Sequence, residues 1–420
     1  MSSPDNHSTA GDLTGRCSGP AAGEIDLPWF ERHLLDDILP HWLAAAVDDD
    51  GFFHPRLTRQ WQRTGEPVAT LVSQGRLCHN FAIGYELTGH DGYREALQRG
   101  AHYLAECFRD PGSPGWVFAV HRDGHIVDGR KDTYGHAFLL FGLAHAARLL
   151  HEDRLVTAIE GAADFVTGWL RDRRRAYAMG MNRQVTKVLE PGRRLANPMM
   201  HLFEAFLAAS ALWATGPPLK HVIWLALAAG VALFVQEHLI RADTGGLPEE
   251  YTSDWVPPAE GAWVNIGHQF EWAYLLSRWS EVRPAPAPDF SAMAEGLLDY
   301  GLAEGFDPTD GGICTRVALN GPTPPEWRKE RGWWEQAEAS RAMMHFAFVR
   351  GRHDLLEPLK RNIEFIKTHL VDHEYGGWFP RPGAVDALKG NEWKVDYHVV
   401  GLCAEAVRLA RMAEQRGGPL

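Results

Sequence analysis

The stretch Gly267-His268-Gln269-Phe270-Glu271-Trp272 decides the fold, because related stretches recur along the chain at a nearly constant interval. It opens a segment of helical periodicity and follows a glycine turn, Gly245-Gly246-Leu247. Four other turn-and-helix units share this order: Gly112–Trp116 with Tyr134–Phe138, Tyr177 with Asn197–Glu204, Gly311–Ile313 with Trp333–Glu338, and Gly376–Trp378 with Trp393–His398. Tyr134, His201, His268 and Glu335 lie 67 residues apart, and His398 follows after 63. Such a period corresponds to two helices with one short and one long loop.

Apolar residues at helical spacing predict twelve helices. Their expected bounds are Leu27–Val47, Val68–Leu87, Tyr93–Phe108, Thr133–Leu150, Arg154–Leu170, Pro198–Trp213, Leu219–Leu239, Val264–Trp279, Phe290–Leu302, Trp333–Val349, His353–His369 and Asp396–Gln415. Length alone favours about three domains, but no linker divides the helices.

Six helical hairpins in a row predict an all-α protein, a single (α/α)6 barrel with one helix of each pair inside the ring. We expect this catalytic domain to span residues 24–416, after a polar, disordered tail at 1–23. The long loops all precede the same member of each pair. They should therefore converge on one face of the barrel, which is where a functional site is expected.

The composition narrows the function. Hydrophobic residues make up 45% of the chain and charged residues 23%, as in a globular protein. A net charge of −12 disfavours nucleic acid as a partner. The 16 tryptophans suit either an aromatic core or a pocket in which indole rings stack on a sugar.

The cellular setting is expected to be the cytoplasm. Five cysteines lie far apart without metal or disulfide spacing, which indicates a reduced compartment. The longest apolar run, Val222–Val235, has 14 residues and suits a buried helix better than a membrane span of about 20 residues. We expect no membrane association. Acidic helical barrels often dimerise, so a homodimer is also expected.

Polar side chains gather where the predicted inner helices begin. His201 and Glu204 are three residues apart, as are His268 and Glu271, and Glu335 and Glu338, so each pair shares a helix face. Further polar and aromatic residues lie near the same helix starts: Arg76, Tyr134, Asn197, Trp393 and His398. Taken singly, each fits a solvated helix face or a satisfied core residue. Recurrence of histidine in three repeat units favours a site.

Several kinds of chemistry lack their motifs. The chain contains no His-Glu-x-x-His zinc motif, no glycine-rich phosphate loop and no Gly-x-Ser-x-Gly elbow. We therefore predict neither a metal nor an organic cofactor. What remains is proton transfer by histidines, whose imidazole titrates near neutral pH. Removal of a proton next to a sugar carbonyl leaves an enediolate, which Arg76, Tyr134 and His201 could stabilise as donors.

The motifs at the starts of the predicted inner helices, around His201, His268, Trp334 and His398, resemble those of the N-acylglucosamine 2-epimerase family. This family contains sugar 2-epimerases and aldose–ketose isomerases. The resemblance covers about Leu27–Arg411 and implies an (α/α)6 barrel that works without a redox cofactor. By position, His268 and His398 resemble the catalytic acid/base pair, and His201 resembles a third histidine that assists ring opening or binding. The resemblance also implies a set of substrate-binding residues: Arg76, Tyr134, Asn197, Glu271, Trp334, Glu338 and Trp393.

Within that family, the Trp333-Trp334 and Trp393-Lys394 patterns favour a 2-epimerase over an aldose–ketose isomerase. The expected substrate is a mannose- or glucose-type aldose, an N-acylhexosamine or a β-linked disaccharide. Two alternatives stay open. Glu271 and Glu338 could serve a glycoside hydrolase, which needs two carboxyl groups beside the scissile bond, or the barrel could be a non-catalytic sugar-binding scaffold.

Overall fold

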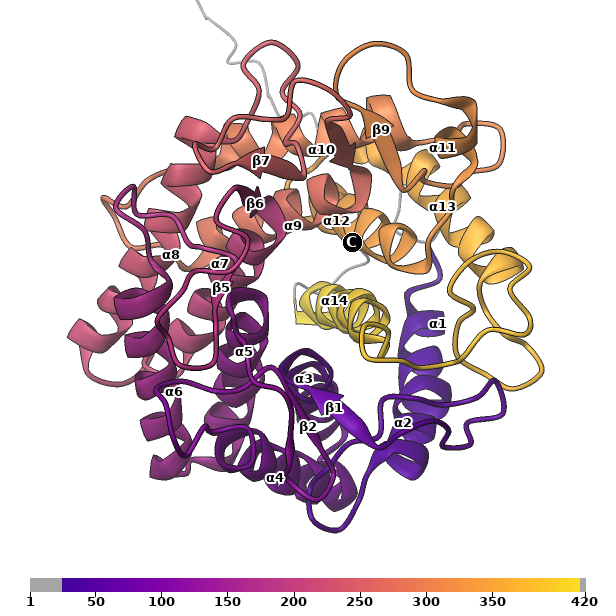
Figure 1. Ribbon diagram of the computed structural model, residues 1–420. Helices are drawn as coiled ribbons and strands as arrows, with labels where there is room; N and C mark the ends of the chain where they lie inside the picture. Colours follow the sequence, from indigo (N-terminus) through magenta and orange to yellow (C-terminus); the bar gives the residue numbers. More distant parts are fainter. Residues whose placement is uncertain (1–24, 416–420) are drawn as a thin grey trace, which may run out of the picture.

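The computed structural model describes residues 25–415, in which two concentric rings of helices surround a common axis (Figure 1). The inner ring contains α3 (Leu71–Thr88), α5 (Thr133–Leu150), α7 (Ala196–Ala211), α9 (Ile266–Val282), α12 (Trp333–Val349) and α14 (Tyr397–Gln415). The outer ring contains α1 (Leu27–Arg32), η2 (His33–Ile38) and α2 (Leu39–Ala46) as one continuous helix, then α4 (Asp91–Glu106), α6 (Asp153–Phe165) with η3 (Val166–Leu170), α8 (Pro218–His238), α10 (Ser291–Gly305), and η4 (His353–Leu355) with α13 (Leu356–His369).

The (α/α)6 barrel predicted from the repeat is confirmed. Each of the twelve expected segments is helical, with ends that differ by a few residues from the predicted bounds. The short helix α11 (Pro325–Lys329) was not expected. The tail predicted at 1–23 lies outside the described residues, and the assignment of 24–416 to one domain stays a prediction.

The inner helices are buried on all sides, which explains why their apolar residues are not confined to one stripe. In α5, every residue from Gly135 to Ala144 is buried, whereas α4 in the outer ring alternates between buried and exposed positions. A fully buried Leu or Phe side chain contributes about 1.5–3 kcal/mol to folding, so a ring of such helices carries most of the core.

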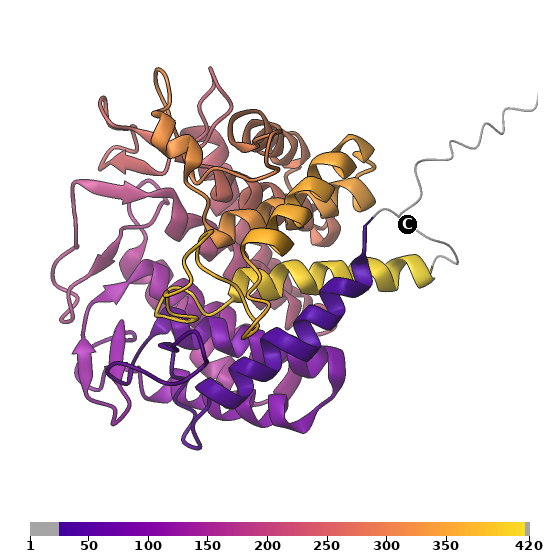
Figure 2. The ribbon, with the colours of Figure 1, turned by 90° about the vertical axis from the view of Figure 1, so that its right-hand side faces the viewer.

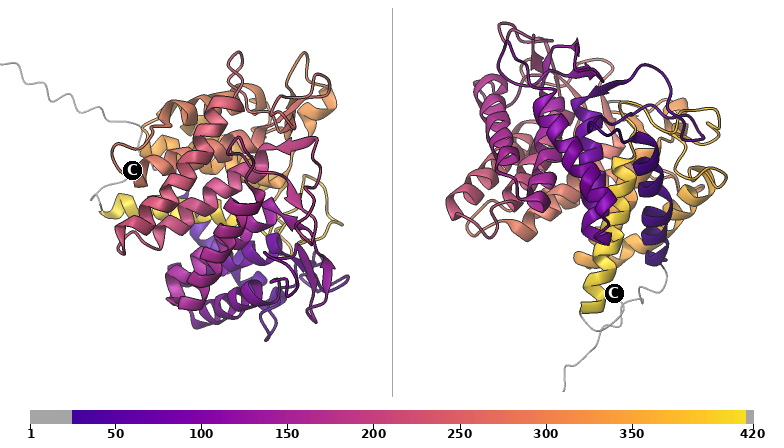
Figure 3. Two further views of the ribbon diagram at one scale, coloured as in Figure 1. Left: turned by 60° about the vertical axis from the view of Figure 1, so that its left-hand side comes forward. Right: turned by 90° about the horizontal axis from the view of Figure 1, so that it is seen from below.

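Short antiparallel strands, which the sequence did not indicate, connect the long loops. They are β1 (Val68–Thr70), β2 (Ala119–His121) and β3 (Ile126–Asp128) in one sheet, and the pairs β4 (Lys131–Asp132) with β5 (Gly180–Met181), β6 (Arg193–Leu195) with β7 (Glu250–Thr252), and β8 (Trp263–Asn265) with β9 (Arg316–Ala318). In each sheet, the strand just before an inner helix pairs with a strand from the following long loop. All these strands lie at the same end of the barrel (Figures 2 and 3).

Two buried glutamines explain the double-glycine turns of the repeat. Gln269 of α9 exchanges two hydrogen bonds with the backbone of Leu247, at 3.0 and 2.9 Å, and Gln336 of α12 does the same with Ile313 at 2.7 and 2.8 Å. The turns before these apolar residues need a left-handed residue, and Gly245 and Gly311 have φ of +77° and +79°. The glycine turn therefore brings the loop backbone within hydrogen-bonding distance of the glutamine side chain on the next inner helix.

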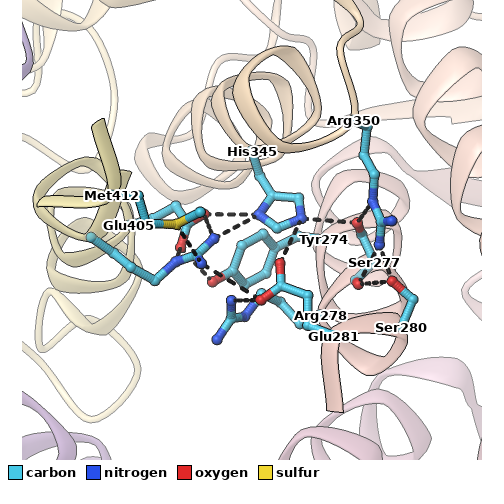
Figure 4. Close-up of polar contacts among 10 residues, drawn as sticks. Tyr274, Ser277, Arg278, Ser280, Glu281, His345, Arg350, Glu405 and Met412 are labelled. Carbon is cyan, nitrogen blue, oxygen red and sulfur yellow. Dashed lines mark hydrogen bonds and ion pairs between the residues drawn. The ribbon is translucent and has the colours of Figure 1, made fainter. Parts of the chain in front are cut away.

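At the opposite end of the barrel, a buried carboxylate joins three inner helices (Figure 4). Glu405 of α14 accepts hydrogen bonds from His345 of α12 at 2.8 Å and from Tyr274 of α9 at 3.1 Å. Arg408 adds two more at 2.8 and 2.6 Å. Burial alone would raise the pKa of Glu405, but the bonds from Arg408 and His345 hold it well below its ordinary value. This cluster ties the last helix of the ring to its neighbours.

Helix α8 is the one described helix that is long and apolar enough to cross a membrane by length and composition. In the barrel it lies in the outer ring and packs against α7, with 39% of its most apolar window buried. Leu219, Val222 and Ile223 on its other side are exposed. The absence of membrane association, the cytoplasmic location and the homodimer stay predictions.

Replacement of Glu405 by Gln should destabilise the barrel by about 3–5 kcal/mol, because Arg408 and His345 lose the buried charge that they bind. Chemical denaturation at pH 7 measures the change. The loss should shrink as the pH falls below 4.5, the ordinary carboxyl value, because the wild-type protein then also loses the contribution of its ionised carboxylate. The exposed Glu95→Gln should change stability by less than about 0.5 kcal/mol. Equal effects from the two variants would contradict a structural role for the cluster.

Candidate active site

A cavity of about 510 Å³ opens at the loop-bearing end of the barrel, above the first turns of the inner helices. Predicted site residues from all six inner helices or the loops that lead into them line it: Arg76, Tyr134, Asn197, His201, His268, Trp334, Trp393 and His398. Trp333, Asn265, Glu249, Trp263, Arg193 and Lys394 complete most of the wall. The cavity is thus at the face that the repeat predicts.

His268 lies in the first turn of α9 and is fixed from two directions. The side chain of Asn265 caps the helix by accepting a hydrogen bond from the backbone N–H of His268 at 3.3 Å. The imidazole Nδ1 lies 2.5 Å from Oε2 of Glu249, and both side chains are buried. Since Nδ1 is engaged, the ring has Nε2 left for the cavity that it lines.

Glu249, which contacts a predicted catalytic histidine, is a residue that sequence reasoning missed. Its backbone C=O accepts a hydrogen bond from Ala196 at the start of α7, and its N–H donates to Trp263 of β8, each at 3.0 Å. These bonds hold the residue between two repeat units, 19 positions before the histidine that it contacts. The periodicity of the helices carries no signal for it, because the contact depends on pairing of the loops.

His398 is held in the same manner at the start of α14. Its Nδ1 donates to Oε1 of Glu338 on α12 at 2.8 Å. Burial lowers the pKa of His398 well below the ordinary imidazole value, and the positive charge of Arg76 lowers it further. The neutral ring therefore presents an unprotonated nitrogen, as a general base requires.

His201 of α7 is the third histidine of the cavity. Its Nδ1 lies 3.0 Å from Oε2 of Glu204, whose other oxygen accepts a hydrogen bond from the hydroxyl of Tyr397. Burial would raise the pKa of Glu204, but the bonds from His201 and Tyr397 hold it below the ordinary value. Burial lowers the pKa of His201, although Glu204 opposes that shift.

The side chain of Arg76 links α3 to the last long loop and to α5. It donates to the backbone C=O of Trp393 at 2.6 Å and to the hydroxyl of Tyr134 at 2.8 Å. These two bonds fix the position of the guanidinium. Because a guanidinium has five N–H donors, others remain free to bind a ligand. Burial raises the pKa of Tyr134 to about 12, so the hydroxyl keeps its proton.

Besides Trp263, three tryptophans form the aromatic part of the wall. The ring of Trp334 lies 4.9 Å from that of His268 and 5.3 Å from that of His398, between centroids. Trp333 is buried and its ring lies 5.5 Å from His398. Trp393 is 53% exposed at the cavity mouth. Trp334 thus contacts both histidines, whereas Trp393 is placed to meet a molecule as it enters.

Glu271 and Glu338 differ from the other predicted substrate-binding residues, because they lie beneath the cavity and are not part of its lining. Burial raises the pKa of Glu271 well above the ordinary value, and neighbouring Glu338 and Glu204 raise it further. Burial also raises the pKa of Glu338, against the influence of Arg341, which lies 3.6 Å away. Glu338 contacts His398, and Glu271 lies 4.0 Å from Nε2 of His201.

The buried carboxylates and histidines form two groups whose geometry could hold a cation: His201, Glu204 and Glu271, and Glu271, Glu338 and His398. In both groups the histidine Nδ1 is bonded to a carboxylate. Catalysis without a metal or cofactor stays a prediction.

The chain is thus an (α/α)6 barrel whose cavity is lined by histidine, arginine and tryptophan side chains. The sequence model of N-acylglucosamine 2-epimerase matches residues 51–402. The chain belongs to this family.

Its relatives catalyse two related reactions. A cellobiose 2-epimerase of Bacteroides fragilis is 24% identical over 401 residues, which cover 90% of this chain and 97% of that protein. A D-mannose isomerase of Thermobifida fusca is 28% identical over 368 residues, or 83% and 84% of the two chains. The solved structure of cellobiose 2-epimerase from Spirochaeta thermophila shares the fold, with a TM-score of 0.82 at 23% identity over 96% of this chain and 99% of that one. This protein is accordingly a carbohydrate epimerase or isomerase.

Replacement of Glu249 by Gln should lower kcat by about 100-fold or more with little change in KM, because the amide no longer selects the tautomer of His268. Steady-state kinetics with the sugar that exchanges its C2 proton measures both constants. Glu250→Gln is the matched control, because that neighbour points to Arg193 and not to a histidine. A normal kcat in Glu249→Gln would show that Glu249 does not position His268.

Proposed function

We propose that this enzyme is a sugar 2-epimerase that inverts C2 of an aldose by proton transfer between His268 and His398. The observation that carries the proposal is the matched setting of these two rings. They come from different inner helices, each is bonded at Nδ1 to a buried carboxylate, and both contact Trp334. Two oriented imidazoles at one cavity are what a two-sided proton transfer requires.

The reaction balances without an external oxidant or reductant. In the open-chain aldose, Nε2 of one histidine takes the proton from C2, and the C–H electron pair forms the C1–C2 double bond of an enediolate. The other histidine then returns a proton to the opposite face of C2, and the carbonyl at C1 forms again. In the reverse reaction the two histidines exchange roles.

The remaining polar residues match the needs of the intermediate. Arg76 has N–H donors left for the oxygen at C1, where negative charge develops. Asn197 has a buried side-chain oxygen without a hydrogen-bond partner among the described residues, and it lines the cavity. A sugar hydroxyl would supply that missing donor. In this proposal, His201, which lines the same cavity, exchanges a proton with the ring oxygen when the pyranose opens.

The charges of the cavity favour a neutral sugar over a sugar phosphate. Two of the three cationic side chains in the wall are paired with carboxylates: Arg193 with Glu190 and Glu250, and Lys394 with Asp396 at 2.6 Å. A phosphate bound at Arg193 or Lys394 would have to compete with these carboxylates, which leaves Arg76 alone to bind the charge.

The alternatives differ in how well the site supports them. An aldose–ketose isomerase would use the same base and enediolate but return the proton to C1, and the relatives include both activities. A hydrolase that uses Glu271 and Glu338 is disfavoured, because both carboxyls lie under the cavity floor. The buried and oriented histidines likewise favour catalysis over simple sugar binding.

Incubation with mannose, glucose, an N-acylhexosamine and cellobiose in deuterated water should give the C2 epimer of one of them with deuterium at C2. NMR of the products locates the label. Deuterium at C1 of a 2-ketose would show that the enzyme is an isomerase and not an epimerase. Sugar binding without any exchange of the C2 proton would reject both activities.

Single variants His268→Ala and His398→Ala should each lose epimerisation by more than about 1000-fold, because each lacks one of the two proton carriers. Each variant should still exchange the C2 proton of one epimer, and the two variants should do so with opposite epimers. His353→Ala, on the surface, is the control. If both variants exchanged the same epimer, the two-sided transfer would be refuted.

The pH profile follows from the lowered pKa of His398. Because this base stays neutral below the ordinary imidazole pKa of 6.5, the acid limb of kcat/KM should have its midpoint below pH 6.5. Initial rates between pH 4.5 and 8, at substrate concentrations below KM, give the profile. A midpoint at or above 6.5 would contradict the neutral form of His398.

A further inference from the structure

We propose that the hairpin between β2 and β3 binds a zinc ion through His121, Asp123 and His125. This site lies on a loop of the barrel, outside the sugar cavity, and it does not depend on the proposed epimerase activity. The three residues alternate along the sequence His121-Arg122-Asp123-Gly124-His125, and one ligand atom from each comes within 4.8 Å of the other two.

The backbone of the hairpin sets the two histidines opposite each other. The N–H of His121 donates to the C=O of His125 at 3.0 Å, and the N–H of Gly124 donates to the C=O of His121 at 2.9 Å. Gly124 has φ of +85°, the left-handed residue that closes a three-residue hairpin loop. His121 and His125 are therefore a cross-strand pair, and their rings stack with centroids 4.6 Å apart.

The side chain of Asp123 folds back over this pair. Its Oδ1 lies 3.0 Å from Nδ1 of His121 and 2.6 Å from Nδ1 of His125, and it also accepts a hydrogen bond from the backbone N–H of His125 at 3.1 Å. Two imidazole nitrogens thus converge on one carboxylate before any ion is bound. The hairpin therefore holds the three side chains together without a bound ion.

The surroundings suit a divalent ion with an open coordination shell. Asp123 and His125 are more than half exposed, so water can occupy the remaining positions. The only neighbouring cation within the loop, Arg122, is turned toward Asp48 at 2.9 Å and Asp50 at 3.5 Å. Two imidazoles and one carboxylate are a ligand set for zinc, whereas magnesium and calcium prefer oxygen ligands alone.

Titration of the full-length protein with ZnCl₂ by isothermal calorimetry should show a site of one ion per chain that His121→Ala and His125→Ala each weaken by about tenfold or more. Asp123→Asn keeps the backbone hydrogen bond to its side-chain oxygen and should weaken zinc binding without disturbing the hairpin. The exposed His373→Ala is the matched control and should bind zinc as the wild type does. Magnesium should give no heat from this site.

Zinc K-edge absorption of the one-to-one complex should show two imidazole ligands, and circular dichroism should show that all variants are folded. Zinc binding that is unchanged in the double variant His121→Ala/His125→Ala would overturn the proposal, as would an absorption spectrum without imidazole. Loss of the site in this variant together with normal sugar turnover would separate it from the active site. Conversely, failure of the epimerase assay would leave the zinc result unaffected.

Discussion

Burial of the N-terminal ends of six inner helices is the constraint on which the rest of this structure depends. A loop that returns to such an end brings polar backbone into a region with little water, where each group needs a partner. The strand pairs and the amides of Gln269 and Gln336 supply those partners. Since each strand before an inner helix pairs with the following long loop, the same bonds that satisfy the backbone also align neighbouring units around the axis.

This alignment gives the histidines their carboxylate partners. Glu249 contacts His268 because its backbone is tied to both Ala196 and Trp263. Glu338 contacts His398 because α12 and α14 are adjacent in the ring. A buried imidazole whose Nδ1 is bonded to a carboxylate has only Nε2 left to face the cavity. The contacts that pack neighbouring units of the barrel therefore also orient the histidines of the site.

The two ends of the barrel use buried charge differently. At the rear, Glu405 is surrounded by donors that favour its ionised form, and the cluster serves to join helices. Beneath the cavity, Glu271 has no such donors and lies beside other carboxylates, so burial favours its neutral form. Similar residue types on similar helices therefore carry an ionised carboxylate at one end and carboxyl groups with raised pKa at the other.

The helical ring, its twelve members and the face that carries the site could be predicted from the sequence, because periodicity and repeat spacing are local properties of the chain. The same holds for the placement of His201, His268 and His398 near one mouth. The two- and three-residue strands could not be predicted, since each is too short to show alternation and exists only through its partner in another unit. Glu249 was missed for the same reason.

By itself, the sequence determined which residues begin the inner helices and therefore which side chains meet at the mouth of the barrel. Only the tertiary structure decided that Glu271 and Glu338 lie below the cavity, that Trp334 contacts both His268 and His398, and that Glu249 is the partner of His268. The physical reason is that helix spacing fixes the direction of a side chain within its own helix. Depth in the barrel and contacts between units depend on how six hairpins close around one axis.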